Sequence, residues 1–238
     1  MYSFPPVLPH GEIESIFPNV YFVTGTSRPI FQGMEWQFSR NMTIVKDGDD
    51  LTLINTVRLD DDGLQALDKL GRVRNVVKLG SFHGIDDAFY VDRYRARLWA
   101  LPGMQHESGL PTDVELTPGG SMPFPSASLF VFETAKQPEG ILRIDREGGI
   151  LVACDSLQNW ADTDRFFSPE SAALMRNIGF IKPANIGLGW RQAAEPKSSD
   201  FVRLSALPFR HLLSAHGTPL RDTAHAQLTQ TFREQFGI

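Results

Sequence analysis

Apolar and polar positions in the first half of the chain alternate over short runs that are separated by turns, a pattern typical of antiparallel strands. The apolar runs at 20–23, 42–45 and 51–54 predict three strands. The last two flank the segment 46–50, whose Asp-Gly step favours a hairpin. The chain is therefore expected to open as a meander of strands.

Helical spacing then interrupts the strands. Leu64, Leu67 and Leu70 lie on one helical face. An aspartate before them is placed to cap the helix, and Gly71 follows as a stop. A buried strand is expected directly afterwards, at 76–79.

The second half repeats this order of strands and helices. A helix is expected from Ser168, a capping residue, to Ile178. An amphipathic helix is expected from Leu220 to Phe236, because apolar residues recur there every four positions. Further strands are expected at 98–101, 129–132, 141–144, 150–153 and 211–214. Since each sheet must bury its faces, this order predicts two packed sheets with helices outside.

The composition indicates a compact globule, since 42% of the 238 residues are hydrophobic and 21% are charged. No linker rich in Pro, Ser or Gly divides the sequence, so residues 1–238 are expected to form a single domain. No apolar run reaches the roughly 20 residues that cross a bilayer, and the first residues do not resemble a secretory signal. Cys154 is the single cysteine, which excludes an intrachain disulfide. We therefore expect a cytoplasmic protein with no membrane partner.

The charge pattern bears on the kind of partner. The net charge is −5, and no Lys/Arg cluster is interleaved with aromatic residues. This pattern argues against nucleic acid as a partner. A small-molecule substrate is expected instead, and the oligomeric state stays open.

Polar side chains follow three of the expected strands, and the first group comprises His83, Asp86 and Asp87. A neutral nitrogen and anionic oxygens at this spacing suit a divalent cation of borderline softness. The alternative is structural: either aspartate can cap a helix that runs to Tyr94, with His83 in a loop.

Asp155 follows the strand at 150–153. A carboxylate at the end of an apolar strand is costly to bury unless a cation or hydrogen-bond donors compensate it. The alternative is that Asp155 and Ser156 only turn the chain. Strand alternation points Cys154 away from Asp155, so the cysteine is expected in the core.

His216 follows the strand at 211–214 and precedes Gly217, which lets the backbone approach a neighbouring group closely. A histidine that serves only the turn is the alternative. Taken singly, each of the three groups is compatible with a structural role.

Taken together, the groups resemble the metallo-β-lactamase fold family. The most specific match is the segment 214–219, Ser-Ala-His-Gly-Thr-Pro, which is similar to the family's terminal Ser-Gly-His-Gly-x-Pro segment and puts His216 in a ligand position. The segment 149–159 is similar to the strand before the family's bridging aspartate, with Asp155 in that position.

Two earlier segments extend the resemblance over most of the chain. Residues 17–23 resemble the opening strand, and residues 51–56 resemble the hairpin that usually ends in Ile-Asp-Thr-Gly, with Asn55 in place of the aspartate. The resemblance implies an α+β fold, a four-layer αββα sandwich in which two mixed sheets pack face to face with helices outside.

The family's central HxHxDH motif is degenerate here. In one register Asp86 takes the motif's aspartate, and in another His83 takes its first histidine and Asp87 its aspartate. By resemblance the family's middle histidine falls near 134–140, which holds no histidine. The usual dinuclear site is therefore incomplete, and one hypothesis is that the ammonium of Lys136 supplies the charge of a second metal.

The resemblance implies a metal-dependent hydrolase whose metal site is reduced, either mononuclear or empty. The expected cofactor is one divalent metal, with Zn²⁺ as first choice and Fe or Mn as alternatives, or none. The expected ligands are His83, Asp87, Asp155 and His216. Asp86 or Asp87 would act as catalytic base, and Lys136 and Trp160 would contact the substrate.

The substrate implied by the resemblance is a small ester, thioester, lactam or phosphodiester. The alternative function is a non-catalytic binding or assembly module, in which Asp155 and His216 share an ordinary hydrogen bond. A redox or iron-binding variant is a third possibility, because oxygen-rich ligation suits iron.

Overall fold

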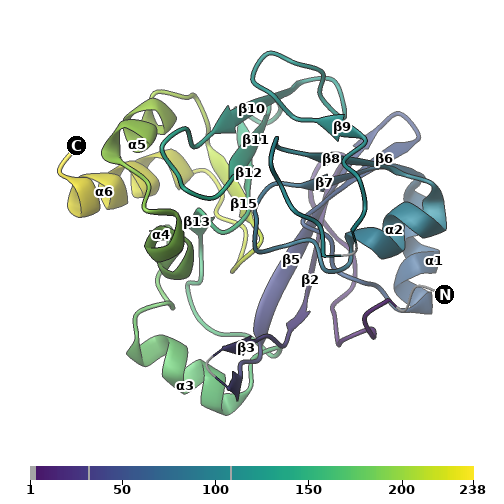
Figure 1. The fold of residues 1–238 in the computed structure, drawn as a ribbon, viewed down its shortest axis with the longest axis horizontal. Helices are drawn as coiled ribbons and strands as arrows, with labels where there is room; N and C mark the ends of the chain where they lie inside the picture. Colours follow the sequence, from purple (N-terminus) through teal and green to yellow (C-terminus); the bar gives the residue numbers. More distant parts are fainter. Residues whose placement is uncertain (1–3, 32, 108) are drawn as a thin grey trace.

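Two β-sheets pack against each other in this computed structural model, which describes residues 4–31, 33–107 and 109–238 (Figure 1). The first sheet has the order β1-β2-β5-β6-β7-β8-β9, and its strands are β1 (Glu14–Phe17), β2 (Val20–Ser27), β5 (Phe38–Asp47), β6 (Asp50–Ile54), β7 (Arg72–Lys78), β8 (Arg97–Ala100) and β9 (Val114–Glu115). The second has the order β10-β11-β12-β15, and its strands are β10 (Ala127–Val131), β11 (Gly140–Ile144), β12 (Ile150–Ala153) and β15 (His211–Ser214). Two short pairs are β3 (Ile30–Phe31) with β4 (Met34–Glu35), and β13 (Leu157–Gln158) with β14 (Asn185–Ile186).

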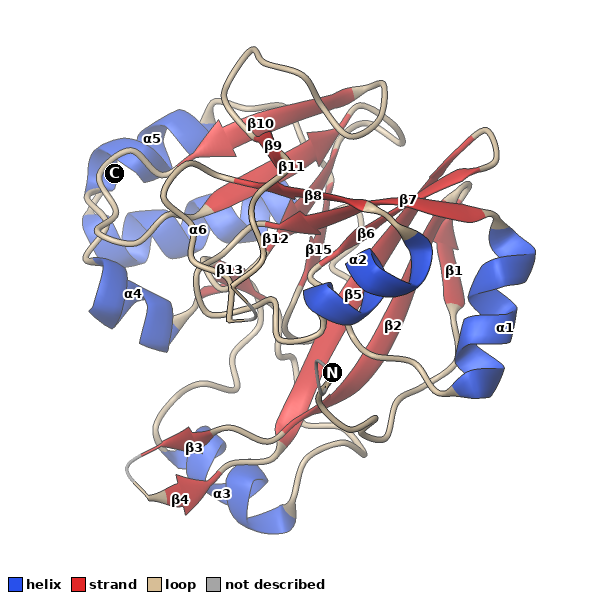
Figure 2. Cartoon of the chain, turned by 45° about the vertical axis from the view of Figure 1, so that its right-hand side comes forward, coloured by secondary structure: helices blue, strands red, loops and turns tan. Residues whose placement is uncertain are grey.

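Helices cover the outer face of each sheet (Figures 1 and 2). The helices are α1 (Asp61–Leu70), α2 (Asp87–Tyr94), α3 (Pro169–Asn177), α4 (Leu188–Ala194), α5 (Ser198–Ser205) and α6 (Ala224–Phe236). Buried residues of α1 and α2 pack on the first sheet, and those of α4, α5 and α6 pack on the second. Helix α3 lies apart, beside the β3–β4 hairpin. The expected four-layer αββα sandwich is confirmed.

Both sheets are mixed, as expected. In the first, β5 and β6 are antiparallel whereas β6 and β7 are parallel. In the second, β11 and β12 are antiparallel whereas β12 and β15 are parallel. The inner faces form one apolar core, to which Phe22, Ile54 and Val77 contribute from one side and Val152 and Leu213 from the other. Such burial is the main favourable term in folding.

The turn and capping residues from which these elements were predicted have those roles in the structure. The β5–β6 hairpin closes through the pair Asp47 and Asp50. Helix α1 begins after Asp60, whose carboxylate accepts a hydrogen bond from the Gly63 N–H. Helix α3 begins after Ser168, whose hydroxyl accepts one from the Ser171 N–H.

The C-terminal helix was predicted too long. It begins at Ala224 instead of Leu220, because the backbone of Leu220 pairs with that of Leu212. The helix from Ser168 ends at Asn177, one residue before its predicted end. The helices α4 and α5 were not predicted from the sequence.

The parallel pairing of β12 and β15 positions the polar loops. Ala153 is the register partner of Ser214, so both strands end at the same edge of the sheet. The loop after β7 meets this edge, where Gly80 forms a bridge with Glu139. No helix in the described ranges is long and apolar enough to cross a membrane.

Candidate metal centre

Asp155 and His216 reach the same point because each follows its strand by two residues. Hydrogen bonds through Ser214 link the two turns: its hydroxyl donates to the Leu157 carbonyl and accepts from the His216 N–H. Asn41, on β5, donates its amide to the Ser214 and Gly217 carbonyls. The turn that carries His216 is therefore fixed by both sheets.

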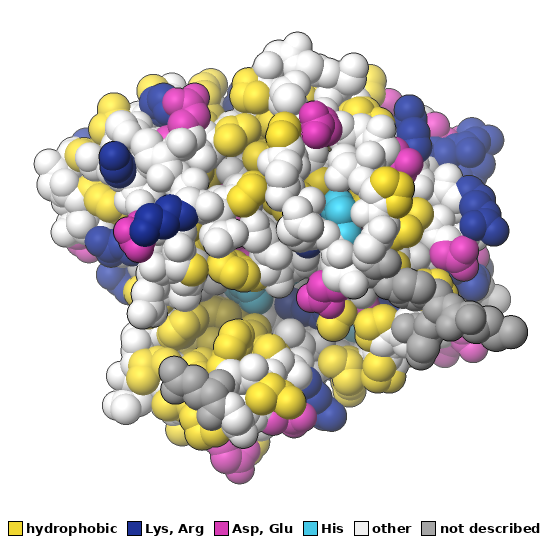
Figure 3. All heavy atoms as spheres, viewed as in Figure 1, with side chains coloured by type: hydrophobic (Ala, Val, Ile, Leu, Met, Phe, Trp, Pro, Cys, Tyr) yellow, Lys and Arg dark blue, Asp and Glu magenta, His cyan; other side chains and the backbone are white. Residues whose placement is uncertain are grey.

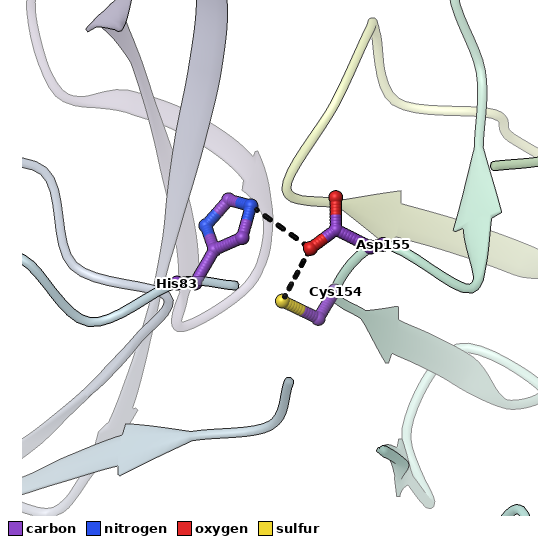
Figure 4. A group of neighbouring side chains, drawn as sticks. All are labelled: His83, Cys154 and Asp155. Atoms are coloured by element: carbon purple, nitrogen blue, oxygen red, sulfur yellow. Dashed lines mark hydrogen bonds and ion pairs between the residues drawn. The ribbon is translucent and has the colours of Figure 1, made fainter. Parts of the chain in front are cut away.

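His83 approaches from the loop after β7, on the opposite side. Its Nε2 lies 3.1 Å from His216 Nε2 and 3.3 Å from Asp155 Oδ2. His216 Nε2 lies 3.1 Å from Asp155 Oδ1. Figure 4 shows the Asp155 carboxylate between His83 and Cys154. Residues from three distant parts of the sequence thus converge on one small volume.

The hydrogen bonds of His216 determine which of its nitrogens faces Asp155 with a lone pair. Nδ1 lies 3.2 Å from the Ser39 carbonyl, which can only accept, so Nδ1 carries the hydrogen. In the neutral imidazole Nε2 then presents a lone pair to the Asp155 carboxylate and to His83 Nε2. Electron pairs converging in this way repel one another unless a proton or a cation lies between them.

The separations among these donor atoms fit a cation. A tetrahedral zinc ion with bonds of about 2.0–2.1 Å holds its ligand atoms about 3.3 Å apart. The two imidazole Nε2 atoms lie 3.1 Å apart, and each lies close to a different oxygen of the Asp155 carboxylate, His216 at 3.1 Å from Oδ1 and His83 at 3.3 Å from Oδ2. Two imidazoles and one carboxylate are also a ligand set that zinc accepts in catalytic sites.

Asp155 is ionised despite its burial. Burial opposes the charge on its carboxylate, but the positive charge and the hydrogen bonds that His83 and His216 provide when their imidazoles are protonated outweigh that effect and hold its pKa below the ordinary aspartate range. Its side chain is therefore an anionic oxygen donor at neutral pH.

Glu139 is a buried neighbour of this site that sequence reasoning missed. Its Oε1 accepts a hydrogen bond of 2.7 Å from the Ser156 N–H, which fixes the turn after Asp155. Its Oε2 has no hydrogen-bond partner among the described residues. Burial, and then the Asp155 charge, raise the pKa of Glu139 well above the usual range. Within the segment 134–140, where the resemblance places the family's middle histidine, Glu139 is the residue that lies beside the turn carrying Asp155.

Cys154 lies in the core between the sheets, as expected, but the prediction that strand alternation points it away from Asp155 is wrong. Its sulfur lies 3.7 Å from Asp155 Oδ2, and it forms a group with His83 and Asp155 whose ligand atoms lie within 4.8 Å of one another. Burial, together with the Asp155 and Glu139 charges, raises the pKa of the thiol. Its sulfur is therefore held as a neutral thiol rather than a thiolate.

Asp86 has structural partners of its own. Its Oδ2 accepts from the Arg40 guanidinium at 2.5 Å and from the Arg58 N–H at 2.8 Å. Asp86 occupies the position before helix α2, but its side chain does not cap the helix. Asp86 lines the cavity that His83, Asp155 and His216 also line, and its carboxylate neutralises a buried arginine.

Asp87 is buried, and neither of its carboxylate oxygens is hydrogen-bonded to His83, Asp155 or His216, since Oδ2 has no hydrogen-bond partner among the described residues. Its Oδ1 accepts a hydrogen bond of 2.6 Å from Thr56. Burial raises its pKa, whereas the Thr56 hydrogen bond and the charge of Lys78 oppose that rise. Lys78 is itself buried and donates to the Gln105 carbonyl at 2.6 Å, and burial lowers its pKa.

The structure does not bring Lys136 to the site. Its ammonium pairs with Glu195 at 2.6 Å on the surface, and its backbone N–H donates to the Ala194 carbonyl. Lys78 is a buried cation near the site, and the signal that would have revealed it is a lysine that directly follows two valines in an expected buried strand.

Trp160 is next to the site but does not line the cavity above it. Its ring lies 4.8 Å from that of His216, and its indole N–H donates to the Ser39 hydroxyl. Because Trp160 is buried, it supports the His216 imidazole from behind.

A cavity of about 530 Å³ opens above the site, and its lining includes His83, Asp155 and His216. This volume is in the range of about 300–1,000 Å³ that is usual for small-molecule sites. Figure 3 shows a hollow between the part of the molecule that holds β3 and α3 and the body above it, with histidine colour in its depth.

Comparisons with known proteins identify the fold. No protein-family model and no curated protein matches the chain. Among solved structures, DIM-1 metallo-β-lactamase exposed to ceftazidime is similar, with a TM-score of 0.62 and 13% identity over 96% of this chain and 98% of that one. A metallo-β-lactamase from Erythrobacter litoralis has a TM-score of 0.60 and 14% identity, covering 96% of each chain.

A third similar structure is FIM-1 from Pseudomonas aeruginosa in its mono-zinc form, with a TM-score of 0.61 and 13% identity over 97% of each chain. Similarity at this identity establishes the arrangement of elements. The protein therefore has the metallo-β-lactamase fold.

Proposed function

We propose that the protein is a metal-dependent hydrolase with a mononuclear site, in which His83, His216 and Asp155 hold one divalent cation. The convergence of two imidazole Nε2 atoms and one carboxylate, 3.1–3.3 Å apart, carries this proposal. A bound cation supplies a nucleophilic water at neutral pH and a Lewis acid for a carbonyl or phosphoryl oxygen.

The neighbouring residues support the ligands in specific ways. The Ser39 carbonyl holds His216 in the tautomer whose Nε2 is free to bind, and Trp160 packs against the ring. Glu139 orients the turn that carries Asp155 through the Ser156 N–H. The three donors named here leave a fourth tetrahedral position for a water or a substrate.

Asp86 and Asp87 act as structural residues in this proposal. Asp86 is neutralised by Arg40, and Asp87 is buried against Thr56. The proposed site thus needs no side-chain base, because a metal lowers the pKa of its own water. Zinc is the proposed metal, with iron or manganese as alternatives, and a small ester, thioester, lactam or phosphodiester is the proposed substrate.

Metal analysis with activity tests the proposal. Protein purified without chelator should hold about one zinc per chain and hydrolyse an activated ester or phosphodiester, and both properties should disappear after chelation and return with zinc. Mutation of a residue that only orients a metal ligand typically lowers metal affinity roughly 10- to 100-fold. His216→Ala removes a proposed ligand, so it should lower zinc affinity by more than that.

His225→Ala is the matched control, because His225 lies on α6 and contacts the Ser205 carbonyl away from the site. It should keep both zinc and activity. If wild-type protein binds no zinc, and its thermal stability is unchanged by chelator, the proposal is wrong and the non-catalytic binding module is favoured.

A further inference from the structure

The cavity above the candidate metal centre has an apolar wall built from separate segments. Leu8 comes from the N-terminal segment, Phe31 from β3, Phe38 from β5, and Phe82 and Ile85 from the loop after β7. These residues come from three parts of the chain, at 8, 31–38 and 82–85, so the wall depends on the fold.

Several of these side chains are exposed to a degree that is unusual for their type. Phe31 is 51% exposed, Phe82 55% and Ile85 43%. When exposed large apolar side chains gather around one hollow, that hollow is more often a ligand-binding groove than an incidental feature of the surface. In Figure 3 hydrophobic side chains border the hollow on both sides.

The charges in the cavity are largely compensated. Arg40 is neutralised by Asp86 at 2.5 Å. Arg28 donates to the Gln37 side chain and is the one lining cation without a carboxylate partner among the described residues, and Glu107 lines the same cavity. Phosphate recognition draws on several convergent cationic donors, which this cavity does not offer.

Resting on the proposed function, we propose that the substrate is an uncharged ester or thioester with an apolar acyl chain of medium length. The chain lies against Phe31, Phe82 and Ile85, and the carbonyl lies at His83, Asp155 and His216. In the reaction the oxygen of water bonds to the acyl carbon, and the bond from that carbon to the alkoxy oxygen or thiolate sulfur breaks. One water proton goes to the leaving alcohol or thiol, and the other leaves from the carboxylic acid.

A chain-length series tests this inference on the zinc-loaded full chain. The substrates are p-nitrophenyl acetate, butyrate and octanoate, with bis(p-nitrophenyl) phosphate as the charged comparison. We expect kcat/KM for octanoate to be at least about tenfold higher than for acetate, because each added methylene is partly buried. Phe82→Ser should reduce the octanoate-to-acetate ratio by about tenfold.

Val202→Ser is the control, since Val202 is 52% exposed but lies on α5, outside the cavity lining. It should leave the ratio unchanged. A flat chain-length profile, or faster cleavage of the phosphodiester than of every ester, overturns the inference while leaving hydrolase activity in place.

A binding measurement separates this inference from the proposed function. N-methyloctanamide and N-methylacetamide are uncharged and are not cleaved, and NMR line broadening reports their binding. One possible result is that no ester is hydrolysed, that N-methyloctanamide binds at least about tenfold tighter than N-methylacetamide, and that Phe82→Ser removes this difference in affinity. That result would support the apolar site and contradict the hydrolase proposal. Equal binding of the two amides overturns the apolar site.

Discussion

Asn55 links the end of β6 to the strand that carries Asp155. Its side-chain amide donates a 2.9 Å hydrogen bond to the Ala153 carbonyl, and the residue is buried. Aspartate, which the resemblance places at this position, has no hydrogen to donate when ionised. The departure from the family pattern therefore creates a contact between the two sheets directly below the candidate metal centre.

Asn55→Asp should consequently destabilise the protein by about 2–4 kcal/mol, because a buried carboxylate would face a carbonyl oxygen. Urea unfolding of the metal-free protein measures this change. Asn19→Asp is the matched control, because Asn19 is exposed and also has a positive φ, 61° against 56° for Asn55. Asn19→Asp should change the free energy of unfolding by no more than about 0.5 kcal/mol. Equal effects of the two substitutions would contradict the role of Asn55.

Lys78 places a positive charge beneath the site. It is 2% exposed, and its ammonium lowers the pKa of the buried Asp87 carboxyl against the effect of burial. Lys78→Met keeps the apolar stem and removes the charge, so it should destabilise the fold by about 1–3 kcal/mol. In the Asp87→Asn background, Lys78→Met should destabilise the fold less than it does in wild type, and the two destabilisations should differ by at least about 0.5 kcal/mol.

A double-mutant cycle in urea checks this coupling. Additive effects of the two substitutions would show that Lys78 and Asp87 do not interact. Lys69→Met is a suitable control, because Lys69 is an exposed residue on α1.

At the scale of elements, helix α5 is attached to the end of β10 through Asp200. This carboxylate accepts from the Glu133 and Thr134 N–H groups and from the Arg203 guanidinium. Burial opposes its ionisation, but the hydrogen bonds from Thr134 and Arg203 lower its pKa below the ordinary value. The unfolded chain therefore binds this proton more tightly than the folded one does.

The resulting stability is present above the unfolded aspartate pKa of about 4 and is lost as the pH falls through the lower folded value. Asp200→Asn should cost about 1–3 kcal/mol at pH 7, and the difference from wild type should shrink between about pH 5 and pH 2. Chemical unfolding across this range measures it. Glu133→Gln, an exposed partner of the same arginine, should change stability by about 0.5 kcal/mol or less. If the difference in unfolding free energy between wild type and Asp200→Asn did not change with pH, Asp200 would not be the source of this pH-dependent stability.

Elements with strong local signals were predictable from the sequence, and those held by tertiary contacts were not. The turn at 46–50 and the cap before α1 are readable without the fold. Helix α4 begins after Gly187 and α5 after Lys197, and neither has the side-chain cap that marks the starts of α1 and α3. Lys136 was misplaced for the same reason, since its position depends on the Ala194 carbonyl at the end of α4.

The candidate ligands could be predicted because each follows an apolar strand, and their convergence follows from the fold. Neither the pattern around His83 nor that around His216 shows that their Nε2 atoms lie 3.1 Å apart. That distance depends on the packing of the two sheets, which brings together two histidines that are 133 residues apart in the sequence. Glu139 was missed because burial of a carboxylate in a segment of mixed composition leaves no periodic signal.

At the scale of the whole molecule, the centre joins the two halves of the sandwich. His83 extends from the first sheet, whereas Asp155 and His216 extend from the second. A cation that binds only the folded chain stabilises it by mass action. Zinc binding is therefore expected to strengthen contact between the sheets as well as to complete the site.

A crystal structure of the zinc-loaded protein, with anomalous scattering recorded at the zinc edge, tests the central claim most directly. The expected result is one anomalous peak per chain, within bonding distance of His83 Nε2, His216 Nε2 and a carboxylate oxygen of Asp155. A map with no peak among these three side chains, or with zinc bound only elsewhere, would contradict the assignment of this centre.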